Sequence, residues 1–123
     1  MKTNELVVNG EKYILKSSIK NEKGATKKNN MPYVIVRTYG AGVFAGYLES
    51  QKGQEVVMRE ARRIWYWAGA ASLSQLATDG TSKPTECKFP AAVDTIKLLD
   101  AIEVINCTEK AKVSINSVEN WSQ

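Results

Sequence analysis

Seven residues near the middle of the chain, Ala-Arg-Arg-Ile-Trp-Tyr-Trp at positions 61–67, limit the possible folds more than any other stretch. Successive side chains of a strand point to opposite sides, so an extended segment here has two different faces. One face would carry Arg63, Trp65 and Trp67, and the other Arg62, Ile64 and Tyr66. Burying both faces is costly unless the charges find partners. The stretch therefore predicts a core on one side and a binding surface on the other.

We predict a strand over residues 62–67, because bulky aromatic residues favour strands and a glycine at position 69 ends the run. The alternative is a helix that opens at Arg59. Met58, Arg62 and Trp65 also fall at helical spacing, and short apolar runs fit both periods.

Runs of β-branched and aromatic residues predict an antiparallel meander before this stretch. Strands are expected at 34–38, 43–50 and 55–58, separated by glycine-containing turns. Gly46 interrupts the second strand, which predicts a bulge or a close approach of two backbones. Alternation of apolar and polar residues predicts two more strands at 93–98 and 101–105. We expect these last two strands to pair with each other.

Two helix starts are visible in the sequence. Ser72 and Gln75 match a capping box, in which the serine side chain accepts from the backbone of the first turn, and Gly80 is placed to end that helix. Thr108 followed by Glu109 predicts a second start. Apolar residues at 111, 115 and 118 give the second helix its buried side.

The expected fold class is α+β: a mainly antiparallel β-sheet or small open barrel with two short helices and an N-terminal hairpin. An Asn-Gly turn at 9–10 between apolar runs at 6–8 and 13–15 predicts the hairpin. Residues 17–30 are rich in Lys and Asn and can bury little, which is typical of a linker. We therefore divide the chain into residues 1–30, a hairpin and lysine-rich flexible lead-in, and residues 31–123, a single α+β domain.

The net charge of +4 lies entirely in the lead-in. Residues 1–30 contain seven Lys and three Glu, whereas residues 31–123 contain ten basic and ten acidic side chains. A protein that binds duplex nucleic acid is expected to carry its basic residues as a stripe across the folded surface. The chain also lacks an apolar run of about 18 residues and an apolar signal core. We expect no duplex nucleic acid or membrane as partner, and a cytoplasmic location.

The chain has no histidine, which removes the usual nucleophilic triads and zinc sites. Cys87 and Cys107 are too few for a metal framework, and we expect two free thiols in preference to a disulfide. We predict a non-enzymatic protein with no catalytic residue, metal or cofactor. An enzyme that works through Lys or carboxylate chemistry is kept as a further alternative.

The arginines and aromatic rings predict a site for a small anionic, nucleotide-like ligand. An indole or phenol can stack on a base, a guanidinium can hold a phosphate, and serine hydroxyls at a helix start can complete the cradle. The predicted ligand-binding residues are Arg37, Tyr39, Arg62, Arg63, Trp65, Trp67, Ser72 and Ser74. The same surface could instead be a subunit interface, where Trp, Tyr and Arg are favoured.

Several segments share a pattern with known sequences: Met-Pro-Tyr-Val-Ile-Val-Arg-Thr-Tyr at 31–39, Ala-Gly-Val-Phe-Ala-Gly-Tyr-Leu at 41–48, and the central stretch from 61 to 77. Residues 101–107 fit the closing segment of the same pattern. These segments resemble a family of small proteins of unknown function encoded by phages and prophages. The resemblance covers about residues 31–108 and supplies no catalytic residues.

The resemblance implies a phage accessory protein made in the cytoplasm of an infected bacterium. On that basis we expect a homo-oligomer that sequesters a host nucleotide immune signal and so acts in anti-defence. The alternative is a virion-associated structural or decoration protein that uses the Trp-Tyr-Trp segment as a subunit contact.

Overall fold

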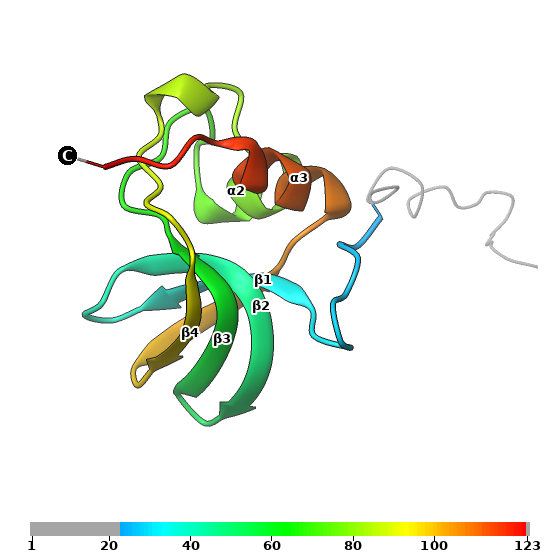
Figure 1. Ribbon diagram of the computed structural model, residues 1–123, viewed down its shortest axis with the longest axis vertical. Coiled ribbons are helices and arrows are strands. Elements are labelled where there is room, and N and C mark those ends of the chain that lie inside the picture. The colour runs from blue at the N-terminus through cyan, green and yellow to red at the C-terminus, as the bar shows by residue number, and fades with distance from the viewer. Residues whose placement is uncertain (1–22, 123) are drawn as a thin grey trace, which may run out of the picture.

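The computed structural model describes residues 23–122, so the hairpin expected at 6–15 lies outside the described residues. Within this part, five strands, two α-helices and one turn of 3-10 helix follow one another (Figure 1). In chain order they are β1 (Tyr33–Thr38), β2 (Val43–Lys52), β3 (Glu55–Arg63), α2 (Leu73–Asp79), η1 (Pro84–Glu86), β4 (Val93–Leu98), β5 (Ala101–Asn106) and α3 (Glu109–Ser117).

The strands form one sheet in the order β4-β3-β2-β1-β5, and every neighbouring pair is antiparallel. The predicted meander of the first three strands and the α+β fold class are confirmed. The expected pairing of the last two strands is wrong. β4 pairs with β3 and β5 pairs with β1, so these two strands form opposite edges of the sheet.

Only Leu99 and Asp100 connect the two edge strands. In a flat sheet, edges separated by four strand spacings of about 4.8 Å would lie roughly 19 Å apart. The three Cα–Cα steps of 3.8 Å from Leu98 to Ala101 span at most about 11 Å. The sheet must therefore curl strongly. Backbone hydrogen bonds fix the connection on both sides: Tyr39 N donates to Asp100 O and Ala101 N to Gln54 O, each at 3.0 Å.

Gly46 lies where β2 touches the backbone of β3, as its position in the sequence predicted. A Cβ atom at this position would lie 2.8 Å from Ala61 Cα and 2.9 Å from Arg59 O. Opposite it, Glu60 has a φ of 52°, and the register of the two strands shifts between Ala45 and Tyr47. The bulge lets the paired strands bend sharply, which the curled sheet requires.

The curled sheet has a core on each of its faces, and β1 contributes to both. Tyr33 and Ile35 pack on the side that the helices cover, whereas Val34 and Val36 pack with Phe44 on the other side. A strand buried on both faces has no room for polar alternation, which explains the continuous apolar run of β1.

The two α-helices pack against each other over one face of the sheet (Figure 1). The predicted serine cap is confirmed, since Ser72 Oγ accepts from Gln75 N at 3.2 Å. Gln75 reaches back as predicted, but its Oε1 accepts from Ala71 N, one residue before the cap, at 2.7 Å. Thr108 Oγ1 caps α3 by accepting from Ala111 N at 3.0 Å. Within residues 23–122, neither α-helix is long and apolar enough to cross a membrane.

Candidate functional site

β3 ends at Arg63, so the strand predicted over residues 62–67 is correct only for its first two residues. The reason is the length of the neighbouring strand. β2 begins at Val43, whose carbonyl accepts from Ile64 N at 2.8 Å, and beyond that point β2 offers no partner. The chain then forms one isolated bridge, between Tyr66 and Lys88. Because the chain leaves the sheet at this point, the next side chains no longer alternate between two opposite faces.

Arg62 points into the protein and is only 4% exposed. Its guanidinium donates to four backbone carbonyls and one side-chain amide oxygen. The acceptors are Pro90 O at 2.9 Å, Ile115 O at 2.7 Å, Phe89 O at 3.0 Å, Val118 O at 2.6 Å and Asn120 Oδ1 at 3.0 Å. All three guanidinium nitrogens are therefore engaged within the chain.

These contacts give Arg62 a structural role in place of the predicted contact with a ligand phosphate. It fastens the end of β3 to the end of α3 and to the loop at residues 89–90. Burial lowers the pKa of Arg62 from its ordinary value, and the surrounding carbonyl dipoles solvate the charge in place of water. Arg62 is not part of the candidate site.

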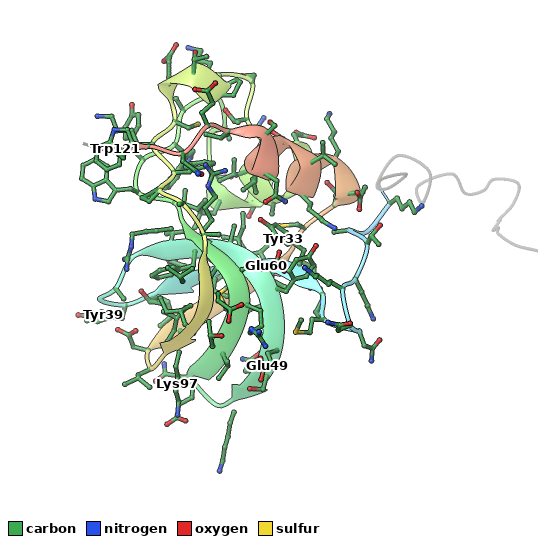
Figure 2. The ribbon with its side chains drawn as sticks, in the orientation of Figure 1. Tyr33, Tyr39, Glu49, Glu60, Lys97 and Trp121 are labelled. Atoms are coloured by element: carbon green, nitrogen blue, oxygen red, sulfur yellow. The ribbon has the colours of Figure 1, made fainter. Side chains whose placement is uncertain are left out.

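Three of the predicted residues lie near the connection between β1 and β2. Arg63 Nη1 donates to Ala41 O at 2.6 Å, and its guanidinium lies 4.4 Å from the ring centre of Phe44. Arg37 pairs with Glu103 across the strands at 3.2 Å. Tyr39 is 86% exposed, and Figure 2 shows it at the tip of this connection. Arg37 and Arg63 already have partners within the chain.

The predicted serines and Trp67 belong to the helical side of the molecule. The Ser72 hydroxyl is occupied by the cap of α2, and Ser74 is exposed on that short helix. Trp67 is half-buried against the core beneath the helices. Of the eight predicted residues, Trp65 is the one that joins an exposed aromatic group.

Trp65 stacks on Trp121, a residue 56 positions further along the chain. The ring centres are 5.1 Å apart and the planes differ by 18°. Lys88 Nζ lies 5.7 Å from the ring centres of both tryptophans and 5.9 Å from that of Tyr66. Trp65 is 58% exposed and Tyr66 is 51% exposed. We call these four residues the aromatic–lysine cluster.

Backbone contacts position the members of this cluster. Lys88 N donates to Tyr66 O at 2.8 Å, and Trp121 N donates to Phe89 O at 3.0 Å. The residue before Trp121, Asn120, is fixed by its bond to Arg62. Figure 2 shows Trp121 at the side of the molecule, near the end of the chain. The buried arginine thus helps to place a partly exposed tryptophan.

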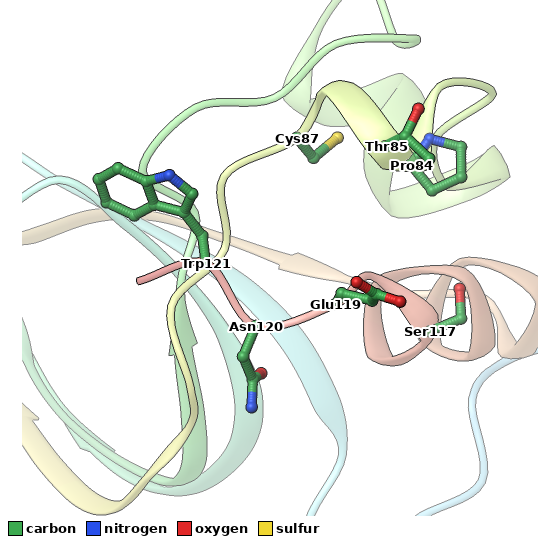
Figure 3. Close-up of a pocket in the computed structure, with 7 residues that line it drawn as sticks. All are labelled: Pro84, Thr85, Cys87, Ser117, Glu119, Asn120 and Trp121. Atoms are coloured by element: carbon green, nitrogen blue, oxygen red, sulfur yellow. The ribbon is translucent and has the colours of Figure 1, made fainter. Parts of the chain in front are cut away.

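A cavity of ≈ 410 Å³ adjoins the cluster and shares Trp121 with it. It lies between η1, the end of α3 and the segment that follows α3 (Figure 3). The residues that line it are Pro84, Thr85, Cys87, Ser117, Glu119, Asn120 and Trp121. A cavity of this size, with an aromatic wall and a few polar groups, is typical of small-ligand sites.

Tyr66, Lys88 and Trp121 were absent from the residues predicted to bind a ligand. Tyr66 was assigned to the face opposite Trp65, an assignment that failed when the strand ended early. Lys88 and Trp121 are 23 and 56 residues from Trp65 in the sequence. The only local signal is a third tryptophan beyond the last apolar position of α3, and it does not specify a partner.

The fold and this surface define a small α+β protein with a curled antiparallel sheet and an aromatic–lysine cluster at one end. The sequence pattern of a family described as Domain of unknown function (DUF6948) matches residues 31–115. The chain belongs to this family. The matched segment contains Trp65, Tyr66 and Lys88, whereas Trp121 lies beyond it. No curated protein and no solved structure matches the chain.

Proposed function

We propose that the protein binds a small anionic, nucleotide-like ligand at the aromatic–lysine cluster and carries out no chemistry on it. The observation that carries the proposal is the position of Lys88, whose ammonium lies within 6 Å of three ring centres. A ring can stack on a base while the adjacent cation holds a phosphate. The predicted arginines already have partners within the chain. We therefore assign to Lys88 the phosphate contact that was predicted for them.

Exposure of the rings supports this function. Large aromatic side chains contribute most of the apolar area that proteins bury, and leaving two of them more than half exposed forgoes that gain. The stack on Trp121 holds Trp65 in a fixed orientation. A fixed platform loses little conformational entropy when a flat ligand binds.

Titration of the full chain with nucleotides tests the proposal. Mononucleotides and cyclic dinucleotides should quench tryptophan fluorescence and release heat in calorimetry, and the affinity should fall as salt is raised because a phosphate contact is screened. Trp65→Ala and Lys88→Gln should each weaken binding by about tenfold or more.

Lys52→Gln is the matched control, because Lys52 is an exposed lysine at the end of β2 and its replacement makes the same charge change. It should bind like the parent protein. Absence of any quenching or heat at millimolar nucleotide would refute the proposal, as would binding that neither cluster variant affects. Unchanged ligand after long incubation, checked by chromatography, tests the non-enzymatic part.

A subunit contact is the second candidate for this surface, favoured by the exposure of Trp65 and Tyr66. Aromatic rings are enriched at interfaces, but lysine is depleted there, which makes Lys88 the argument against this alternative. Light scattering over a range of protein concentrations should show self-association that Trp65→Ala abolishes, if the surface joins two copies.

The cellular role that we propose is sequestration of a nucleotide immune signal in the cytoplasm of a phage-infected bacterium. It extends the resemblance to phage-encoded proteins, and a virion-associated structural protein is the alternative. Mass spectrometry of purified virions separates the two. A sequestering protein should be missing from the particles, whereas a decoration protein should be present in a fixed ratio to the capsid.

A further inference from the structure

The cavity beside Trp121 differs from the other cavities of similar size in the described part of the chain. A second cavity of ≈ 410 Å³, near Gly69 and Lys110, has no aromatic residue in its wall. A third, of ≈ 370 Å³, is bordered by Tyr33, whose side chain is buried in the core. The cavity beside Trp121 alone among these three combines a partly exposed ring with a carboxylate, that of Glu119.

Contacts within the protein fix the residues that form the wall of this cavity. Trp121 is fixed by its stack on Trp65 and by its backbone bond to Phe89. Asn120 Oδ1 already accepts from Arg62, so this oxygen is not free to accept from a ligand. The Ser117 hydroxyl donates to Ser114 O at 2.7 Å within α3. Two of the polar groups are thus used by the fold itself.

Glu119 is the one charged acceptor among the residues that line the cavity, beside the neutral hydroxyl of Thr85. Its carboxylate makes no ion pair with any other residue of the segment 23–122. Figure 3 shows Glu119 at the end of α3, with its carboxylate turned toward Ser117 and away from the ring of Trp121. An ionised carboxylate only accepts hydrogen bonds, and it can take two parallel N–H donors at once. Such a group repels phosphate but suits the donor edge of a base.

From this arrangement we infer that the cavity binds the base of the ligand and selects guanine through Glu119. The inference rests on the proposed function, since Lys88, whose ammonium lies 5.7 Å from the ring centre of Trp121, would hold the phosphate. Guanine presents a ring N–H next to an amino group, which together match a carboxylate. Adenine presents one amino group beside an unprotonated ring nitrogen, whose lone pair faces the carboxylate unfavourably. Cytosine has the same mismatch.

Calorimetric titration of the full chain with GMP, AMP, CMP and UMP under identical conditions tests the inference. GMP should bind about tenfold or more tightly than AMP, because the mismatched base leaves an acceptor without a donor. Glu119→Gln should reduce the ratio of the two affinities to about threefold or less, since an amide offers one acceptor in place of two. The variant should still bind nucleotides through Trp65 and Lys88.

Glu86→Gln is the matched control. Glu86 is an exposed carboxylate of η1 outside the cavity wall, so its replacement changes the charge of the same region without removing the acceptor. It should leave the preference for GMP intact. Thermal unfolding of both variants should match the parent protein, which would show that any lost preference reflects the site.

The outcomes separate the inference from the proposed function. Equal affinity for GMP and AMP, with binding that still depends on Trp65, would overturn guanine selection and leave nucleotide binding in place. A preference for GMP that survives Glu119→Gln would overturn the role of Glu119. Failure of all four nucleotides to bind would remove the proposed function and the inference with it.

Discussion

Arg62 and Trp65 are three residues apart in the sequence, yet their surroundings are opposite. Arg62 is buried, with every guanidinium nitrogen bonded to the protein's own chain. Trp65 is mostly exposed and contacts one other ring and a lysine. Both meet the same segment after α3, Arg62 from inside and Trp65 from outside. Neighbouring residues of one sequence motif can therefore have different roles: Arg62 stabilises the fold, whereas Trp65 is available for binding.

The largest effect that would test this division is expected from Arg62→Met. The replacement removes one donor from each of four carbonyls. Phe89 O and Ile115 O keep a backbone donor, whereas Val118 O and Pro90 O lose the donor that Arg62 supplies, and we expect the free energy of unfolding to fall by about 3 kcal/mol or more. Arg63→Met is the matched control, because the neighbouring arginine is exposed and should cost less than about 1 kcal/mol. Urea denaturation measures both. Equal losses would mean that burial does not distinguish the two arginines.

High pH should also lower the free energy of unfolding, because a thiol is buried in the core. Burial raises the pKa of the Cys107 thiol to about 12, whereas the reference value is 9.0. Between these values the unfolded chain releases a proton that the folded chain retains, so the free energy of unfolding falls as pH rises. The slope from Cys107 should approach about 1.4 kcal/mol per pH unit.

Cys107→Ser removes this titration and should flatten the dependence of stability on pH above pH 9. Burial raises the pKa of Tyr33 as well, so a residual slope is expected at higher pH. Denaturation curves recorded at a series of pH values provide the measurement. An unchanged slope in the variant would show that the thiol is accessible to solvent.

Asn120→Ala tests the link between the two regions. The amide oxygen accepts from buried Arg62, and the next residue is Trp121, whose ring is partly exposed. We expect a loss of about 1–2 kcal/mol in stability, because one hydrogen bond to a charged donor disappears. Tryptophan fluorescence should change in the folded protein as the stack loosens. A stability loss without any change in fluorescence would show that the stack does not depend on Asn120.

The smallest effect on stability is expected from Trp65→Ala. Its ring is exposed and its main contact is the stack on Trp121, so about 1 kcal/mol or less should be lost. Ligand affinity should nevertheless fall by tenfold or more. Thermal unfolding and nucleotide titration of the same preparation compare the two. A large loss of stability with unchanged affinity would reverse the roles assigned to Arg62 and Trp65.

Local rules predicted much of the fold. The capping box at Ser72, the end of α2 at Gly80 and the close approach at Gly46 each depend on the conformation of a few neighbouring residues. The pairing of β4 with β5 failed because Leu99 and Asp100 look like a hairpin loop in the sequence. Pairing depends instead on which strands the curled sheet brings together, and that information is spread over β1, β2 and β3.

The candidate site was predicted less well than the fold, for a related reason. Alternation correctly put Arg62 and Ile64 on one face, since both are buried. Alternation alone could not show that β2 starts at Val43. The prediction therefore extended the neighbouring strand past the point where it ends. The partners of Trp65 come from two distant segments, and no pattern of spacing connects Lys88 or Trp121 to it.

Leu99 and Asp100 join the two edge strands, so this one short segment holds both edges of the sheet in place. If a protease cut the chain there, each edge strand would end in a new chain terminus. The connection that keeps the sheet bent would then be lost. Cleavage at this exposed leucine should therefore loosen strands that lie far apart in the sheet, and a permuted chain opened at the same place would have to bend on its own.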